Sequence, residues 1–199
     1  MTINRAATLT PKQLDQAVEH IATTSRHPER DELMFLLSHL SGLRVSEIVK
    51  LNLVTAVLDA EGRLPNRQAL RNIHIMSDVG KINMARDIPR HPCVAVSLKR
   101  FMKKFPNLNY IAYAPQNGLA RMTVNNLIVW FWQFYKFINF ANCSSHSGRR
   151  SFATRTARSL ETHGQSLRDL QDLLGHARLD TTQRYIEPTN RTHNLIALL

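Results

Sequence analysis

The chain has 199 residues, of which 43% are hydrophobic, so it is long enough to bury a core in one domain or two small ones. No apolar run reaches the length of a membrane span and no signal-peptide pattern opens the sequence, which argues against a membrane or secreted protein. Because 26 Lys and Arg residues outnumber 15 Asp and Glu residues, the net charge of +11 favours a polyanion such as nucleic acid as the partner; a merely basic surface is the alternative.

Three helices are predicted at the start of the chain. Apolar residues recur at helical spacing after Thr10, which predicts a helix over residues 10–23 with Thr10 as its cap. A second helix is expected after Pro28 and ends at Gly42, and a third, short helix follows over residues 46–51. The expected buried face of the second helix consists of Leu33, Leu36, Leu37 and Leu40.

The next segment shows the alternation that is typical of strands. One strand is predicted over residues 54–58, on Val54, Ala56 and Leu58, and another around Ile73 and Ile75. Residues 85–89 are expected to form the antiparallel partner of the second strand. Gly80 and Lys81 mark the tight turn between them, where a long lysine side chain can reach a ligand.

The second half of the chain is predicted to be helical again. Helices are expected over residues 94–104 and 124–139, the latter capped by Thr123 and apolar most of the way round, which predicts a core helix. Ser144 or Ser145 is expected to cap a helix that carries His146 and Arg149. Ser166 is expected to cap a helix over 167–174 that Gly175 ends, and Asp180 or Thr181 begins a final short helix bearing Tyr185.

Cysteine and histidine usage gives no sign of a disulfide framework or a metal site. Cys93 and Cys143 are the two cysteines, which fits packed thiols in a reducing cytoplasm. The nine histidines show no paired Cys/His spacing of the zinc type. We therefore expect neither a metal nor a cofactor.

The polar residues near the C-terminus suit chemistry at a phosphodiester. His146 and Arg149 are three positions apart, and His176 precedes Tyr185 by nine. Arginines are always charged and donate bidentately to phosphate oxygens, and histidines exchange protons near neutral pH. A tyrosine nucleophile forms a phosphotyrosyl ester, which conserves the bond energy for rejoining. This pattern favours DNA transesterification that uses positive side chains in place of metal ions.

Four motifs, in this order, give the chain a resemblance to the tyrosine recombinase (phage integrase) family over nearly its whole length. Residues 42–47, Gly-Leu-Arg-Val-Ser-Glu, resemble the first-arginine motif, and Gly80-Lys81 with Arg86 and Pro89 resembles the β-hairpin lysine segment. Residues 146–149 match His-x-x-Arg, and residues 174–176 with Thr181, Thr182 and Tyr185 match the segment leading to the nucleophile. The resemblance implies a catalytic set of Arg44, Lys81, His146, Arg149, His176 and the nucleophile Tyr185. It also implies that Lys81 is the general acid and that Glu47 supports the fold around Arg44.

The same resemblance implies a fold, an activity and partners. The expected fold is mainly α with a small antiparallel β-sheet (α+β), as in the family's catalytic domain. The implied activity is site-specific recombination of double-stranded DNA through a 3′-phosphotyrosyl intermediate, for integration, excision or inversion. The implied assembly is a homotetramer on DNA, helped by accessory DNA-bending proteins, in a cytoplasmic, nucleoid-associated setting.

We expect residues 1–199 to form a single catalytic domain with a flexible segment over 1–9 and a C-terminal tail over 189–199. No separate N-terminal core-binding domain is expected, a layout similar to the small fimbrial-switch recombinases. The apolar end of the tail is expected to dock into a neighbouring protomer or, alternatively, onto its own subunit; its anchors are Leu195, Ile196, Leu198 and Leu199.

Other interpretations remain open from the sequence. A topoisomerase-like nicking and rejoining enzyme, or a non-catalytic DNA-binding regulator of the same fold, has the same motifs. Taken singly, Arg44 is equally explained as an ion-pair partner of Glu47, His146 as a helix cap and His176 as a helix-end histidine. Tyr185 is equally explained as a packed aromatic residue.

Overall fold

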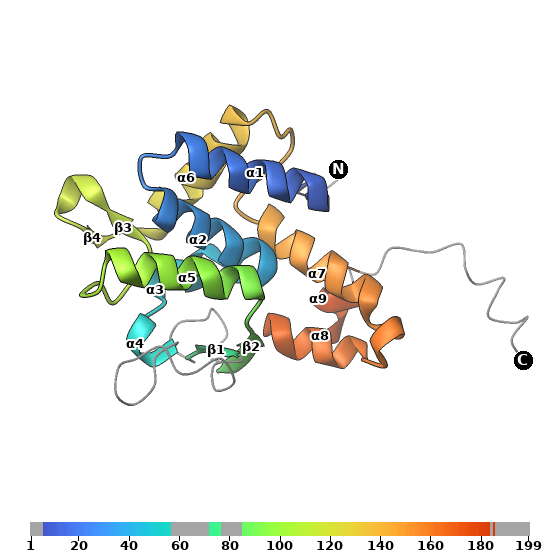
Figure 1. Cartoon of the computed structure of the whole chain (residues 1–199). Helices are drawn as coiled ribbons and strands as arrows, with labels where there is room; N and C mark the ends of the chain where they lie inside the picture. Colours follow the sequence, from blue (N-terminus) through green and yellow to red (C-terminus); the bar gives the residue numbers. More distant parts are fainter. Residues whose placement is uncertain (1–5, 57–71, 77–84, 184, 186–199) are drawn as a thin grey trace, which may run out of the picture.

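The computed structural model describes residues 6–56, 72–76, 85–183 and 185 (Figure 1). The described chain is mainly helical with two small antiparallel sheets, as predicted. None of its helices is long and apolar enough to cross a membrane. The helices are α1 (Pro11–Thr24), α2 (Pro28–Leu40), α3 (Val45–Lys50), α4 (Leu53–Ala56), α5 (Pro92–Lys104), α6 (Val124–Phe137), α7 (Ser147–Ser159), α8 (Leu167–Leu174) and α9 (Leu179–Gln183), and the strands are β1 (Asn72–Ile75), β2 (Arg86–Pro89), β3 (Tyr113–Ala114) and β4 (Ala120–Arg121).

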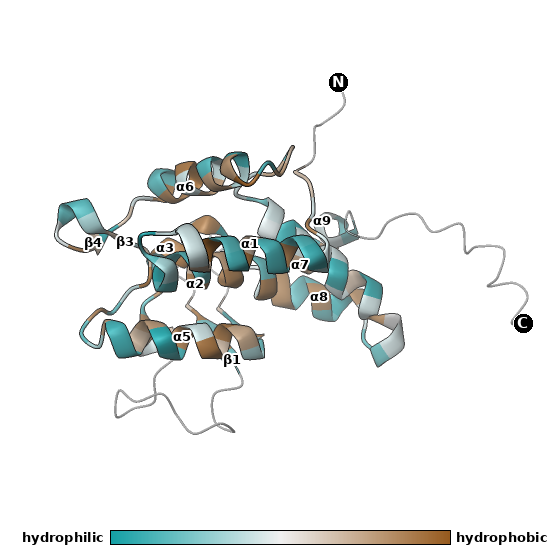
Figure 2. Cartoon of the chain, turned by 45° about the horizontal axis from the view of Figure 1, so that its top comes forward, coloured by the Kyte–Doolittle hydropathy of each residue, from teal (hydrophilic) through white to brown (hydrophobic). Residues whose placement is uncertain are grey.

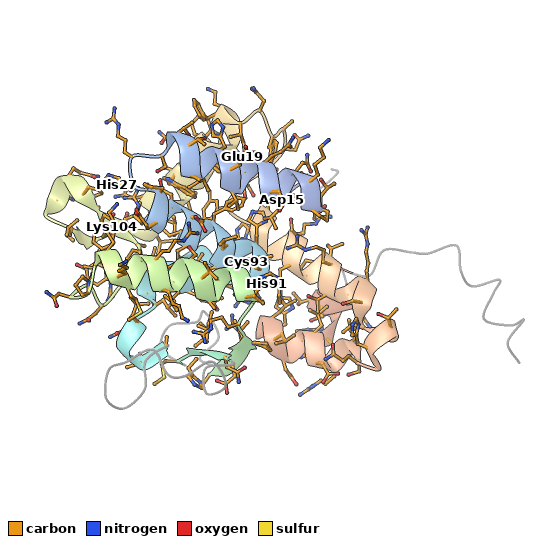
Figure 3. The ribbon with its side chains drawn as sticks, viewed as in Figure 1. Asp15, Glu19, His27, His91, Cys93 and Lys104 are labelled. Atoms are coloured by element: carbon orange, nitrogen blue, oxygen red, sulfur yellow. The ribbon has the colours of Figure 1, made fainter. Side chains whose placement is uncertain are left out.

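Helix α2 is the centre of the fold and packs against α1, α5 and α7 (Figure 1). Its residues from Arg30 to His39 are all buried, although five of these ten are polar or charged, because helices pack against α2 on several sides. Around it, α1 exposes Asp15 and Glu19, and α5 is capped by His91, whose Nδ1 accepts a hydrogen bond from the Cys93 amide (Figure 3). The central helix also contacts α3, so it supports both α3 and α7, two of the helices that carry the polar residues described below.

The predicted helix caps are confirmed at both ends of the chain. Thr10 Oγ1 accepts from the Gln13 amide at 3.3 Å, and the Gln13 side chain accepts from the Thr10 amide at 2.9 Å. Ser166 makes the same reciprocal pair with Asp169 at the start of α8. Gly175 ends α8 in the left-handed conformation with φ of 59°.

The predicted antiparallel pairing of the strands around Ile73 and residues 85–89 is confirmed, and the turn predicted at Gly80 and Lys81 lies outside the described residues. The strand predicted over 54–58 is wrong in its described part, residues 54–56. β1 and β2 pair antiparallel with Ile73 opposite Ile88, which buries both side chains. Leu53–Ala56 instead forms the short helix α4, because Leu53 and Ala56 are three positions apart and both face the core. Leu58 and Lys81 lie outside the described residues.

Helix α6 is not the core helix that its composition predicts. Its buried residues are Leu127, Phe131 and Tyr135, one stripe at four-residue spacing. On the other faces Trp132 is 55% exposed and Phe137 65% exposed, and hydrophobic as well as hydrophilic residues follow the whole helix in Figure 2. The buried stripe faces the core, where α6 contacts α3, and Trp130 and Phe134 are partly buried beside it, so the apolar residues on the outer face remain at the surface.

Candidate active site

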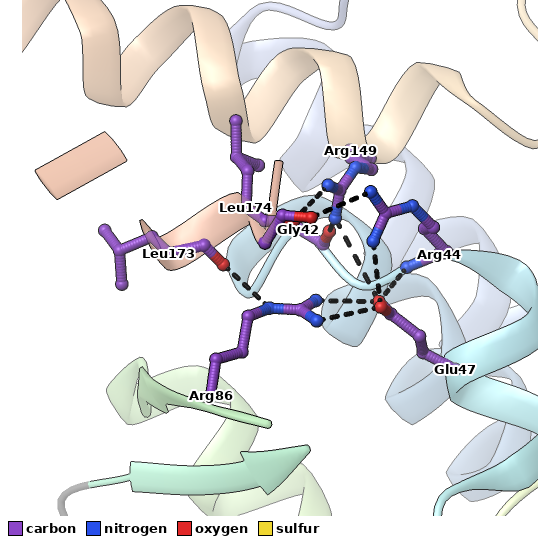
Figure 4. A network of polar contacts seen from close by, with 8 residues as sticks. Gly42, Arg44, Glu47, Arg86, Arg149, Leu173 and Leu174 are labelled. Atoms are coloured by element: carbon purple, nitrogen blue, oxygen red, sulfur yellow. Dashed lines mark hydrogen bonds and ion pairs between the residues drawn. The ribbon is translucent and has the colours of Figure 1, made fainter. Parts of the chain in front are cut away.

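A single buried carboxylate, that of Glu47 on α3, is the centre of a cluster of arginines (Figure 4). Glu47 has no exposed surface. Its Oε1 accepts from Arg44 Nη1 at 3.0 Å and from Arg86 Nη1 at 2.9 Å, and its Oε2 accepts from the Arg44 amide at 2.8 Å and from Arg86 Nη2 at 2.9 Å. Arg149 Nη1 lies 4.0 Å from Oε2.

Glu47 is held in its charged form by these partners. Burial alone raises the pKa of this carboxyl, but the hydrogen bonds and charge of Arg86, the Arg44 amide and the charge of Arg149 outweigh burial and lower its pKa below the ordinary value. The cluster therefore contains three guanidinium cations and one carboxylate anion, which leaves a net charge of +2 (3 − 1).

Arg44 occupies the turn between α2 and α3. Gly42 makes this turn possible, because its φ of 65° suits glycine and a Cβ there would lie 2.4 Å from a ring carbon of Phe152. Arg44 pairs with Glu47, as the ion-pair interpretation expects, and its Nη2 also donates to the Gly175 carbonyl at 3.5 Å. Its side chain remains 19% exposed, so it can also reach an anion from solvent.

Arg149 is placed by α7 in a nearly closed environment. It is 5% exposed and donates to the Gly42 carbonyl at 2.6 Å and to the Leu174 carbonyl. Burial and the charge of Arg44 lower the pKa of Arg149 to about 9, so it remains charged at pH 7. A guanidinium that is partly desolvated in this way interacts more strongly with an anion than one in water.

His176 follows the left-handed turn at the end of α8 and is buried. Its Nδ1 lies 2.9 Å from Thr182 Oγ1, and its carbonyl accepts from Gln171 Nε2 at 2.8 Å. Burial and the charges of Arg149, Arg44 and Arg86 lower the pKa of His176 to about 4. The imidazole is therefore neutral at pH 7 and has its Nδ1 occupied by the threonine.

Tyr185 lies beside His176. The two rings stack with centroids 6.0 Å apart and an angle of 10° between their planes. The Tyr185 amide donates to the Thr182 carbonyl at 3.0 Å, which ties the residue to the end of α9 although it lies just beyond that helix. The side chain is half-buried and packs against the small core cluster of α7 and α8, as the packed-aromatic interpretation expects.

The remaining predicted site residues have different outcomes. His146 is exposed and precedes the first turn of α7, where its amide donates to Ser144 Oγ at 3.3 Å. The predicted serine cap is therefore wrong in position, because the N-cap residue is His146 itself and it makes no side-chain capping bond. Within the described residues no hydrogen bond or ion pair joins the His146 side chain to the arginine cluster, and Lys81 lies outside them.

Arg86 is the residue of this cluster that the sequence reasoning did not include in the site. Its guanidinium spans Glu47 and the Leu173 carbonyl, which accepts from Nε at 3.0 Å. One signal was available: Arg86 and the buried Ile88 are two positions apart on β2 and share a face, which places an arginine on the inner side of a strand. The structure thus brings Arg44, Arg149, His176 and Tyr185 together and adds Arg86.

Comparison with known proteins gives a family and a fold. Residues 7–191 match the model of the Phage integrase family. The chain is 28% identical over 189 residues to tyrosine recombinase XerC of Herpetosiphon aurantiacus, covering 92% of this chain and 56% of that protein. It is 32% identical over 185 residues to tyrosine recombinase XerD of Rickettsia conorii, covering 87% and 57%. The chain therefore spans little more than half the length of these relatives.

A solved structure supports the same fold. The crystal structure of the XerH site-specific recombinase bound to its difH substrate, a pre-cleavage complex, superposes with a TM-score of 0.71. The match covers 97% of this chain and 54% of that one at 18% sequence identity. At this identity the likeness establishes the arrangement of helices and strands.

Proposed function

Because the chain belongs to the phage integrase family, we propose that it cuts and rejoins double-stranded DNA at specific sites through a covalent bond between Tyr185 and a 3′ phosphate. The observation that carries this proposal is the convergence of Arg44, Arg149 and His176 beside the Tyr185 ring. Arg44 comes from a segment more than a hundred residues before the one that carries the other three. A cluster with a charge of +2 next to a phenol suits an attack on a phosphodiester.

The proposed step exchanges one phosphate ester for another. The Tyr185 oxygen forms a bond to phosphorus, the bond from phosphorus to the 5′ oxygen breaks, and the 5′ oxygen leaves as a hydroxyl after it takes up a proton. Arg44 and Arg149 donate hydrogen bonds to the non-bridging phosphate oxygens and stabilise their negative charge. Rejoining is the reverse reaction and needs no further energy source.

Two further groups in this scheme transfer protons, and a third contacts the phosphate. The neutral imidazole of His176 is available to accept the phenolic proton, since its pKa of about 4 leaves it unprotonated at pH 7. Lys81 is assigned as the acid for the leaving 5′ oxygen on the family resemblance. His146, exposed one turn before Arg149, is assigned to a phosphate oxygen on the same ground.

The assembly belongs to the same proposal. The strongly basic chain suits the phosphate backbone of duplex DNA. Exchange of strands between two sites needs several protomers, so we assign a homotetramer on DNA, with residues 1–199 as the catalytic unit of each protomer and accessory DNA-bending proteins as further partners. The cytoplasm, at the nucleoid, is the proposed location.

The test traps the intermediate. The chain is incubated with sheared genomic DNA from around its gene, protein-linked fragments are recovered, and their ends are sequenced to find the cleaved site. A duplex of that site with a nick next to the scissile phosphate then loses a short fragment on cleavage, so rejoining fails and the covalent adduct accumulates. The wild type is expected to form the adduct and Tyr185→Phe is not.

The matched control is Tyr110→Phe. Tyr110 is a partly buried tyrosine whose hydroxyl donates to the Leu119 carbonyl at 2.7 Å and makes no contact with the arginine cluster among the described residues, so this variant should form the adduct as the wild type does. An adduct formed by Tyr185→Phe would identify a different nucleophile. Retention of genomic fragments by the wild type without any covalent adduct would favour the regulator interpretation and overturn the proposal.

A further inference from the structure

Arg86 is the most completely engaged arginine of the cluster (Figure 4). All three guanidinium nitrogens have partners: Nη1 and Nη2 donate to the two oxygens of Glu47, each at 2.9 Å, and Nε donates to the Leu173 carbonyl at 3.0 Å. Resting on the proposed function, we propose that Arg86 is a positioning residue that occupies Glu47 and so keeps Arg44 and Arg149 available for the scissile phosphate.

The Glu47 carboxylate and the substrate phosphate compete for the same cations, Arg44 and Arg149. The two-pronged contact of Arg86 satisfies both carboxylate oxygens, whereas Arg44 makes one side-chain contact with Glu47 and Arg149 stays at 4.0 Å. A buried carboxylate that loses its main partner destabilises the protein. Movement of the nearest cation toward the carboxylate offsets part of that loss. Without Arg86, Arg44 and Arg149 are the cations within reach, and each one drawn toward Glu47 is lost to the substrate.

The second anchor of Arg86 fixes the end of α8. Three consecutive carbonyls there each accept from a different arginine: Leu173 from Arg86, Leu174 from Arg149 and Gly175 from Arg44. The last carbonyls of a helix have no partner within the helix and carry its partial negative charge, so they orient guanidinium groups well. His176 follows directly, so the contact of Arg86 also helps to place the imidazole.

The close approach of Arg86 to α8 depends on Gly175. A Cβ on Gly175 would lie 3.1 Å from both Cδ and Nη1 of Arg86. The same glycine therefore supplies the left-handed turn and the space for this guanidinium. This packing suits the planar guanidinium of an arginine, so a positive charge alone does not meet the requirements of position 86.

The experiment uses Arg86→Lys, which keeps the charge but cannot bridge two oxygens and a carbonyl. With the nicked duplex that traps the wild type, we expect the single-turnover cleavage rate at saturating DNA to fall at least about tenfold, with the Kd for that duplex within twofold of wild type. The control is Arg168→Lys, an arginine on α8 whose side chain is 72% exposed, which should cleave at the wild-type rate. Thermal melting of each variant is followed by circular dichroism.

A substrate analogue separates positioning from a merely structural role. A methylphosphonate at the scissile position removes one anionic oxygen and so reduces the need for the arginines. If Arg86 acts through them, the deficit of Arg86→Lys shrinks several-fold on this analogue; an unchanged deficit on both substrates overturns the proposal, as does an Arg86→Lys variant that cleaves at the wild-type rate. Absence of any adduct with the wild type overturns the proposed function itself, and this inference with it.

A second pair of variants keeps the idea testable if Arg86→Lys folds poorly. Arg86→Gln leaves the carboxylate of Glu47 without its main partner, whereas Glu47→Gln combined with Arg86→Gln removes both charges. The double variant is expected to cleave faster than Arg86→Gln alone, because no rival anion remains. Equal or slower cleavage by the double variant refutes the mechanism through Glu47.

Discussion

Acid is expected to weaken this fold through His39, which lies in the last turn of α2 with no exposed surface. Its Nε2 lies 2.8 Å from the Tyr135 hydroxyl, and its ring packs against Phe35 with centroids 4.2 Å apart. Burial and the charge of Arg155 lower the pKa of His39 from 6.5 to about 3. In the unfolded chain His39 therefore binds a proton as the pH falls through about 6.5, whereas in the folded chain it stays neutral until about pH 3.

The sign and size of the effect follow from this difference. Stability contributed by neutral His39 is present above pH 6.5 and is lost as the pH falls toward 3, because the unfolded state binds more protons in that range. At about 1.4 kcal/mol per pH unit, the loss amounts to about 2 kcal/mol between pH 7 and pH 5 and approaches about 5 kcal/mol below pH 3.

The assay compares urea unfolding of the wild type and His39→Gln at pH 7, 6 and 5. His176 also has a lowered pKa, but it is present in both proteins, so the difference between them isolates His39. The variant should be less stable at pH 7, and its disadvantage should shrink by about 2 kcal/mol by pH 5. The exposed His163 provides the control variant, His163→Gln. A gap between wild type and His39→Gln that stays constant with pH would refute the reasoning.

Two further substitutions test the packing and the site. Gly148→Ala should lower the free energy of unfolding by about 1–3 kcal/mol in urea unfolding, because the new Cβ would lie 2.2 Å from Ser38 Oγ under α7. Since that hydroxyl has no hydrogen-bond partner among the described residues, Ser38→Ala combined with Gly148→Ala should recover part of the loss, and no recovery would contradict the clash. Thr182→Val should slow single-turnover cleavage about five- to tenfold, because His176 loses the hydrogen bond at Nδ1 that orients its ring. Thr181→Val, one position earlier, should cleave at the wild-type rate, and equal rates for both threonine variants would count against the orienting role.

The sequence predicted those parts of the fold that depend on local chemistry. The caps at Thr10 and Ser166 and the turn at Gly175 depend on residues three or four positions away, and all are found where expected. The strand prediction for residues 54–56 is wrong because an alternation of apolar residues over so few positions is also compatible with one turn of a helix.

The remaining errors involve contacts between distant parts of the chain. A helix that is apolar on every face, as α6 is, does not reveal which stripe its neighbours cover. The pair of Arg86 and Glu47 joins residues 39 positions apart, on a strand and a helix, so neither residue predicts the other from spacing. The catalytic set predicted from the sequence therefore lacked Arg86, which donates to both carboxylate oxygens of Glu47.

The position of α6 also decides what intrinsic fluorescence can report. The two tryptophans of the sequence, Trp130 and Trp132, both lie on this helix, the first stacked on Phe134 and the second largely in solvent beneath the Lys136 ammonium. Tryptophan emission from this protein consequently reports on the surroundings of one helix that contains none of the residues of the arginine cluster. A molecule that covers the exposed face of α6 would shift the spectrum without contacting Tyr185, and an emission signal that stays constant on addition of DNA would be no evidence that the reactive centre is empty.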